Sequence, residues 1–259
     1  FFRTNGYDEV FSQEDYPADK VVNSFGVQDD FLYDYAIPVL NQRAATGQPF
    51  FATLLSISNH PPYVIPPFFH PKTSGPETQI VEYADWALRK FFEEARKQSW
   101  FDNTIFVLEG DHGKLVGDAE CELPESYNHI PLMIYSSRIH PEEKNTFGGQ
   151  VDIQPTILGL LNIDYLQNNF GVDLLKEERP CMFYTADNMI VGRNDTLLYL
   201  FNYETQQEFT YHIDNGKLKA VPMDDRFLPL KEYSFSMLQS AEFLVKHGKT
   251  VNSVPFTQQ

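Results

Sequence analysis

A carboxylate and an imidazole stand side by side directly after a predicted strand. Residues 104–108 are apolar or β-branched without a break, which predicts a strand buried on both faces. Asp111 and His112 follow between Gly110 and Gly113. Side chains at the carboxyl ends of strands converge on a crevice in α/β sheets. An anionic oxygen beside a neutral nitrogen suits Mn²⁺, Mg²⁺ or Zn²⁺, so we consider Asp111 and His112 as ligands of one divalent metal.

The alternative for the same pair is an Asp that caps the turn and a His on the surface. A metal role requires both side chains to come within ligand distance of a common point. Glu109 precedes the pair. Glu109 either orients His112 without binding the metal itself, or points away from the crevice, as alternate strand residues do.

Asn59 and His60 follow a second predicted strand, residues 49–58. An imidazole can carry or release a proton near neutral pH, so His60 can contact a phosphate or protonate a leaving alkoxide. The alternative is a structural histidine in the turn that Pro61 and Pro62 form. Asn59 either contacts substrate beside His60 or simply holds the turn.

The elements that would position these residues alternate between strands and helices. Helical spacing of apolar residues predicts helices over 29–43, 77–99, 150–161 and 230–246. A run of apolar residues predicts a further strand over 130–135. The order strand, helix, strand over 49–108 predicts one βαβ unit with a right-handed crossover. From residue 182 the pattern changes to short strands separated by turn residues, which predicts an antiparallel meander. Its strands are predicted over 182–184, 189–191, 196–201 and 208–213.

Composition narrows the classes of function. The net charge is −16 with only 20 Lys and Arg, which argues against a nucleic-acid surface. No apolar run reaches the roughly 20 residues that a membrane-spanning helix needs. Cys121 and Cys181 are too few for a disulfide framework, and they are either bridged or two free thiols. The acidic run 118–125 is typical of a solvated loop rather than of a second metal site.

Several segments together resemble the lipoteichoic acid synthase and phosphoglycerol transferase branch of the alkaline phosphatase and sulfatase superfamily. The resembling segments are residues 5–8, 25–29, 49–61, 83–85, 103–113 and 150–161, and more loosely 170–175. Their order and spacing make the resemblance specific, over about residues 1 to 215. It favours the metal role for Asp111 and His112. The resemblance also matches His60 to a family histidine that faces the substrate, and it suggests a substrate-side role for His129, with no role as the alternative.

The resemblance implies a fold class, which is an α/β domain with an alkaline-phosphatase-like α/β/α sandwich and a small antiparallel C-terminal subdomain. Residues 1–178 are expected to form the C-terminal part of the sulfatase-like catalytic domain. Residues 179–259 are expected to form the subdomain, a β meander with a C-terminal helix.

The resemblance also implies an activity. Family members attack a phosphodiester with a threonine, outside the cytoplasm, and are anchored by an N-terminal membrane region. One divalent metal is held by the Asp and His, by an acidic residue and by the threonine. The last two precede the segment that matches Phe1, so we expect no nucleophile in this chain and no activity of the chain alone.

The leading hypothesis is therefore a metal-dependent phosphoglycerol transferase. It would act on a lipid-linked phosphodiester in cell-envelope polymer synthesis, at the cell surface or in the periplasm. Alternatives within the superfamily are a phosphoethanolamine transferase, a phosphodiesterase or a sulfatase acting on a sulfate ester. An alternative of another class is a non-catalytic module that binds glycan or lipid.

Overall fold

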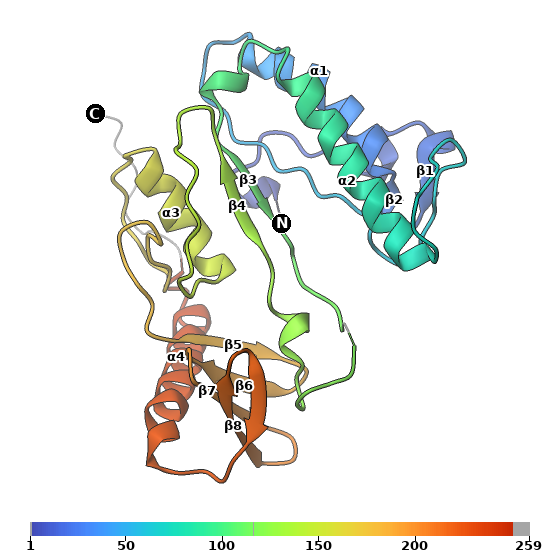
Figure 1. The fold of residues 1–259 in the computed structure, drawn as a ribbon. Coiled ribbons are helices and arrows are strands. Elements are labelled where there is room, and N and C mark those ends of the chain that lie inside the picture. The colour runs from blue at the N-terminus through green and yellow to red at the C-terminus, as the bar shows by residue number, and fades with distance from the viewer. Residues whose placement is uncertain (1, 116, 251–259) are drawn as a thin grey trace. The chain divides into compact units, whose positions relative to one another are not determined.

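The computed structural model describes residues 2–115 and 117–250 (Figure 1). The chain divides into two compact units, residues 1–107 with 133–139 and residues 108–132 with 140–259, which we call unit 1 and unit 2. The predicted boundary at residue 178 stays a prediction. The last nine residues of the predicted subdomain, 251–259, lie outside the described residues.

Two long helices pack against each other in unit 1. Helix α1 spans Asp29–Ala44 and begins with two acidic residues, which the helix dipole favours. Helix α2 spans Pro76–Ala95, and its first-turn proline needs no N–H partner. The predictions for both helices are confirmed, although α2 ends four residues earlier than the predicted residue 99.

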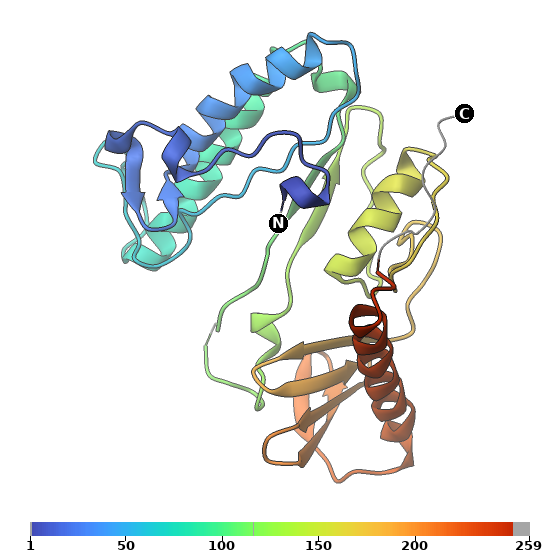
Figure 2. The same cartoon turned by 180° about the vertical axis from the view of Figure 1, so that it is seen from behind.

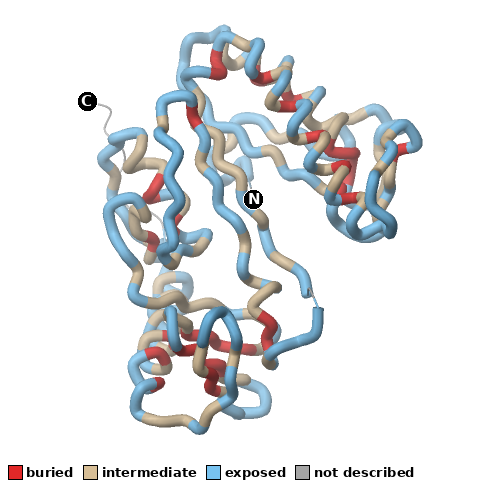
Figure 3. Tube along the Cα trace, viewed as in Figure 1, coloured by how far each residue is buried: buried red, intermediate tan, exposed pale blue. Residues whose placement is uncertain are grey.

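The core of unit 1 lies along the facing sides of these helices (Figure 3). Apolar side chains at helical spacing on α2 are buried and meet Ala36 and Leu40 of α1. The Trp100 indole N–H donates to Asn41 Oδ1 at 2.7 Å, so the buried ring keeps its polar partner. The shorter elements of unit 1 are the 3₁₀ turns Arg3–Asn5, Gln13–Asp15, Ala18–Lys20 and Phe101–Asn103, and the antiparallel strands β1 (Val21–Asn23) and β2 (Gly26–Val27).

The predicted strand over residues 49–58 is wrong for the described structure. The segment is extended but no ladder forms along it, and Phe51 and Leu55 are 78% and 69% exposed. A strand requires a neighbour for its N–H and C=O groups, and none of the described strands pairs with this segment. The predicted βαβ unit therefore lacks its first paired strand here.

Strand β3 (Phe106–Glu109) pairs with β4 (Leu132–Tyr135). Both strands were predicted, but burial of β3 on both faces is wrong. Its first three residues are half-buried and Glu109 is exposed, while Met133 of β4 is 54% exposed. Phe106 packs against the α1–α2 core, and a sheet of only two strands leaves the remaining side chains partly uncovered.

The C-terminal part of unit 2 is a five-stranded antiparallel meander, as predicted. Its strands are β5 (Met182–Ala186), β6 (Met189–Arg193), β7 (Leu197–Asn202), β8 (Gln207–Asp214) and β9 (Lys217–Ala220), of which β9 was not predicted. The turn at Asp187 and Asn188 and the turn at Asn215 and Gly216 have positive φ at both central residues. This backbone matches the twist of a two-residue hairpin.

Both faces of the meander are covered. On one face, helix α4 (Leu228–Lys246) packs against β5 and β6, as predicted, and follows a 3₁₀ turn at Asp225–Phe227 (Figure 2). On the other face lies Leu123, which is 1% exposed. Its neighbour Glu122 accepts a hydrogen bond from Tyr211 Oη at 2.6 Å, and Glu125 pairs with Arg193. The acidic run 118–125 is thus not simply a solvated loop, because its second half covers the sheet.

The two cysteines are free thiols that pack into different clusters of the meander. Burial raises the pKa of the Cys121 thiol to about 11 and also raises the pKa of Cys181. A raised pKa lowers the thiolate fraction at pH 8, and the thiolate is the reactive form. We expect Ellman's reagent to titrate both thiols at pH 8 quickly in urea and slowly without it. A folded Cys121 that reacts at the unfolded rate would contradict its burial.

Candidate functional site

The turn that carries Asp111 and His112 lies tightly against residues 126–127 of the same unit. The Gly113 N–H donates to Tyr127 O at 2.8 Å. A Cβ at Gly113 would lie 1.9 Å from Ser126 O, so the main chain could not approach this closely with any other residue there. The short 3₁₀ turn Glu125–Tyr127 therefore forms one wall of the turn.

One side-chain oxygen of Asp111 lies close to one ring nitrogen of His112. Their side chains are 74% and 66% exposed, and Asp111 Oδ2 lies 3.7 Å from His112 Nε2. Metal bonds to carboxylate oxygen and imidazole nitrogen are about 2.1 Å long. Twice that length exceeds the separation, so a single ion can lie at bonding distance from both atoms. Asp111 Oδ1 is used differently, because it accepts the His112 N–H at 2.9 Å.

The local contacts of His112 fix its tautomer. Its Nδ1 lies 2.7 Å from Gly113 O. A carbonyl oxygen only accepts, so Nδ1 carries a hydrogen, and in the neutral ring Nε2 is the nitrogen with the lone pair. In metal-binding histidines, one ring nitrogen usually binds the metal while the other donates its N–H to a carbonyl or carboxylate.

The residues present fit part of a divalent-metal site. An anionic oxygen and a neutral nitrogen are hard and borderline donors that Mn²⁺, Mg²⁺ or Zn²⁺ accept. Within residues 2–115 and 117–250, no third His, Cys, Asp or Glu joins the pair in a group that could hold an ion. The pair would therefore supply two ligands of a larger set.

Glu109 does not orient the His112 ring, because the Nδ1 partner is Gly113 O. The Glu109 side chain belongs to an exposed residue at the end of β3. Burial of the carboxyl raises its pKa, and the nearby negative charge of Asp111 raises it further. The alternative in which Glu109 points away from the crevice stays a prediction.

His60 lies in unit 1 and has the same tautomer as His112. Its Nδ1 lies 2.7 Å from Pro61 O, so Nδ1 donates and Nε2 is available for a ligand. The ring packs on Phe25 with centroids 4.0 Å apart. These two contacts orient the His60 ring. The residue is exposed, so its Nε2 is open to a ligand.

A buried carboxylate fixes the chain just before His60. Asp29, which is 2% exposed, accepts the N–H groups of Ile57 and Ser58 through Oδ1, each at 3.0 Å. Ser58 Oγ accepts the Asp29 N–H at 3.0 Å and donates to Gln28 Oε1 at 2.8 Å. The start of α1 therefore holds the turn that presents Asn59 and His60.

The five predicted site residues fall in both units. Asn59 and His60 belong to unit 1, and Asp111, His112 and His129 belong to unit 2. Asn59 and His129 are both exposed. The His129 N–H donates to Glu125 O at 2.8 Å, so His129 is tied to the 3₁₀ turn that forms the wall against Gly113. The structure brings the side chains of Asp111 and His112 together and places His129 on an adjoining segment.

Sequence reasoning missed Gln150. Its Nε2 donates to Gly110 O at 3.2 Å and to Asp111 O at 2.9 Å. Gln150 lies in the 3₁₀ turn Gln150–Asp152 that precedes helix α3 (Ile153–Leu160). The predicted helix over 150–161 covers both elements. The available signal was that Gln150 opens one of the resembling segments, although nothing in the sequence links it to Asp111.

A family model described as Sulfatase matches residues 1–163, which is more than half of the 259 residues. The chain belongs to the sulfatase family. Members of the sulfatase and alkaline phosphatase superfamily are enzymes that use divalent metals. The donor set and geometry of Asp111 and His112 agree with that general property.

Among sulfatase-family relatives, the chain is similar to lipoteichoic acid synthases. It is 28% identical over 238 residues to lipoteichoic acid synthase 1 of Bacillus subtilis, covering 83% of this chain and 36% of that protein. It is 25% identical over 204 residues to the lipoteichoic acid synthase of Staphylococcus aureus, covering 66% of this chain and 30% of that protein. The chain thus spans about a third of the length of these relatives. The predicted resemblance is confirmed.

Solved structures confirm the predicted alkaline-phosphatase-like α/β/α fold class. A protein of the alkaline phosphatase superfamily from Vibrio parahaemolyticus has a TM-score of 0.80 at 25% identity, covering 92% of this chain and 60% of that one. A lipoteichoic acid synthase from Listeria monocytogenes has a TM-score of 0.78 at 22% identity, covering 99% and 67%. The second likeness shows the fold alone.

Proposed function

We propose that this sulfatase-family chain is part of a metal-dependent phosphoglycerol transferase. The transferase would act on a lipid-linked phosphodiester in the synthesis of a cell-envelope polymer. The observation that carries the proposal is the Asp111–His112 pair, with Oδ2 and Nε2 3.7 Å apart and the His112 tautomer fixed. The similarity to lipoteichoic acid synthases supports phosphoglycerol as the transferred group.

Asp111 Oδ2 and His112 Nε2 would hold the divalent metal. When bound, the metal supplies Lewis-acid neutralisation of charge on the phosphoryl oxygens. The Nδ1–H bond from His112 to Gly113 O keeps the Nε2 lone pair available for this role. The Asp111 carboxylate supplies the negative charge, and its Oδ1 is held by the His112 N–H.

His60 is proposed to contact the phosphate or to protonate the leaving alkoxide. Its Nδ1–H bond to Pro61 O persists in both protonation states, because Nδ1 carries hydrogen in each. Only Nε2 therefore changes, from an acceptor to a donor. Asn59 and His129 are proposed as substrate-side residues because of their positions next to His60 and next to the Gly113 wall.

The remaining ligands and the nucleophile are proposed to come from parts of the protein outside this chain, which spans about a third of its relatives. We also propose a membrane-anchored full-length protein that works at the cell surface or in the periplasm. None of the described helices has the length and apolar character of a membrane span. Reading the complete coding sequence tests both proposals directly.

Manganese titration of the 259-residue chain tests the metal role. With ¹³C-labelled histidine, we expect paramagnetic Mn²⁺ to broaden the ring signals of His112 before those of His70 and His140. Asp111→Asn should weaken this effect at least about tenfold, because the oxygen ligand loses its charge. His112→Gln assigns the signal.

The matched control is Asp118→Asn, which changes an exposed acidic residue of the same unit. It should leave the broadening of His112 unchanged. Equal broadening of all histidines, or an unchanged response of Asp111→Asn, would show that the pair does not hold the metal.

A further inference from the structure

We infer that Gln150 is a positioning residue that clamps the main chain of the metal-binding turn. The inference concerns how the Gly110–Gly113 turn keeps its shape, and its consequence for metal binding rests on the proposed function. Gln150 itself would touch neither the metal nor the substrate. It acts through the peptide groups that carry Asp111.

The clamp uses both hydrogens of one side-chain amide. Gln150 Nε2 donates to Gly110 O at 3.2 Å and to Asp111 O at 2.9 Å, across about 40 residues of chain. An amide nitrogen carries two N–H donors, and two successive carbonyls use both. The turn has glycine on both sides of the pair, and glycine leaves the backbone free to adopt many conformations. These two carbonyls belong to the peptide groups on either side of the Asp111 Cα. Fixing them therefore restricts the backbone rotation that would move the Asp111 side chain.

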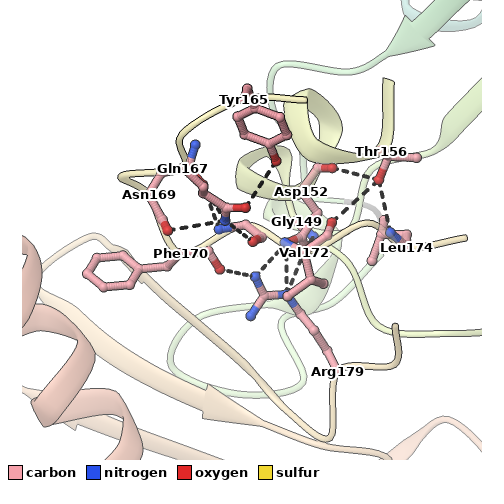
Figure 4. A network of polar contacts seen from close by, with 11 residues as sticks. Gly149, Asp152, Thr156, Tyr165, Gln167, Asn169, Phe170, Val172, Leu174 and Arg179 are labelled. Carbon is pink, nitrogen blue, oxygen red and sulfur yellow. Dashed lines mark hydrogen bonds and ion pairs between the residues drawn. The ribbon is translucent and has the colours of Figure 1, made fainter. Parts of the chain in front are cut away.

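The turn that carries Gln150 is itself anchored by a buried carboxylate. Asp152 is fully buried, and its Oδ2 accepts the Gly149 N–H at 2.8 Å. Arg179 donates to Asp152 through two nitrogens, Nε to Oδ2 at 2.8 Å and Nη2 to Oδ1, a bidentate ion pair with the Arg179 side chain 8% exposed. The main chain just before Gln150 is therefore held by the Asp152 carboxylate, which is itself paired with Arg179 (Figure 4).

A second layer closes around the same carboxylate. The Val172 N–H donates to Asp152 Oδ1 at 2.8 Å. Arg179 also donates to Phe170 O. Gly171 lies so close that a Cβ there would be 2.1 Å from Val151 O. The Val151–Asp152 peptide is therefore packed against the main chain at Gly171, and Gln150 extends from a rigid base to the metal-binding turn.

The test compares Gln150→Met with wild type. Methionine has a similar length and keeps the packing but has no N–H donor. In the metal-free chain we expect faster amide hydrogen exchange at residues 110–114, measured by mass spectrometry, with an unchanged melting temperature. In the Mn²⁺ titration we expect the dissociation constant at His112 to rise about tenfold, the usual scale for loss of a group that supports a ligand.

Gln239→Met is the matched control, because Gln239 is exposed on α4 of the same unit. It should behave as wild type in both measurements. Exchange at residues 110–114 that is identical in Gln150→Met and wild type would overturn the clamp. If wild type shows no selective Mn²⁺ effect while Gln150→Met still loosens the turn, the clamp stands and the proposed function fails.

Discussion

Asp152→Ala is expected to melt roughly 10 °C below the wild-type chain. The substitution leaves Arg179 buried without its partner and leaves the N–H groups of Gly149 and Val172 without their acceptor. Removing one partner of a buried ion pair costs about 3–5 kcal/mol. In a protein of this size each kcal/mol lowers the melting temperature by roughly 2–4 °C. Calorimetry or circular dichroism measures the shift.

The strength of the Arg179 contact explains the size of this effect. Burial alone would lower the pKa of the guanidinium, but its hydrogen bonds to Asp152 and the charge of that carboxylate raise it above the ordinary value. Arg179→Met added to Asp152→Ala should restore part of the lost stability, since neither charge is then buried alone. Glu242→Gln, which breaks the exposed pair with Lys246 on α4, should change the melting temperature little. A wild-type melting temperature for Asp152→Ala would show that the pair does not stabilise unit 2.

Under the proposed function, the full-length protein should cleave a lipid-linked glycerophosphodiester in the presence of Mn²⁺, measured as diacylglycerol released from phosphatidylglycerol as the probe. Asp111→Asn and His112→Gln should each lower the rate at least about 100-fold. Each change removes a metal ligand itself, rather than a residue that supports a ligand. The 259-residue chain alone should show no turnover. Fluorescent phosphatidylglycerol, phosphatidylethanolamine and p-nitrophenyl sulfate offered in parallel measure which ester is cleaved.

The outcomes separate the related activities. Preferred cleavage of the sulfate ester would make the protein a sulfatase, and preference for phosphatidylethanolamine would make it a phosphoethanolamine transferase. His140→Gln, an exposed residue outside the predicted site, should retain the wild-type rate. Full activity of Asp111→Asn would refute the metal role, and turnover by the isolated chain would refute a nucleophile that lies elsewhere.

The elements that sequence predicted well are those whose stability is local. Helix α2 has clear apolar spacing, α1 begins with two acidic residues, and α2 and α4 each have a proline in the first turn. Two of the hairpin turns have Asp, Asn or Gly at their central positions. The segment around Phe51 was predicted wrongly for the opposite reason. Its composition suits a buried strand, but a strand forms only when another segment supplies the ladder, and composition cannot show whether that partner is present.

The candidate site was predictable only where the chemistry is carried by adjacent residues. Asp111 and His112 are neighbours in sequence, so their proximity needed only the strand end before them. Asp152 accepts the N–H of Gly149, three residues before it, but its main partner, Arg179, lies 27 positions away in a segment without a motif. Gln150 donates to two carbonyl oxygens, a group that every residue has, and so no side-chain pattern marks its target.

The meander described above has a consequence for the order in which unit 2 folds. Each of its strands pairs with the next strand in sequence through a short connection, so closing those loops costs little entropy. The covering contacts of Glu125 with Arg193 and of Glu122 with Tyr211 span 68 and 89 positions. The hairpins can therefore form first. Until residues 118–125 pack against the sheet, the face that contacts Leu123 is open to water.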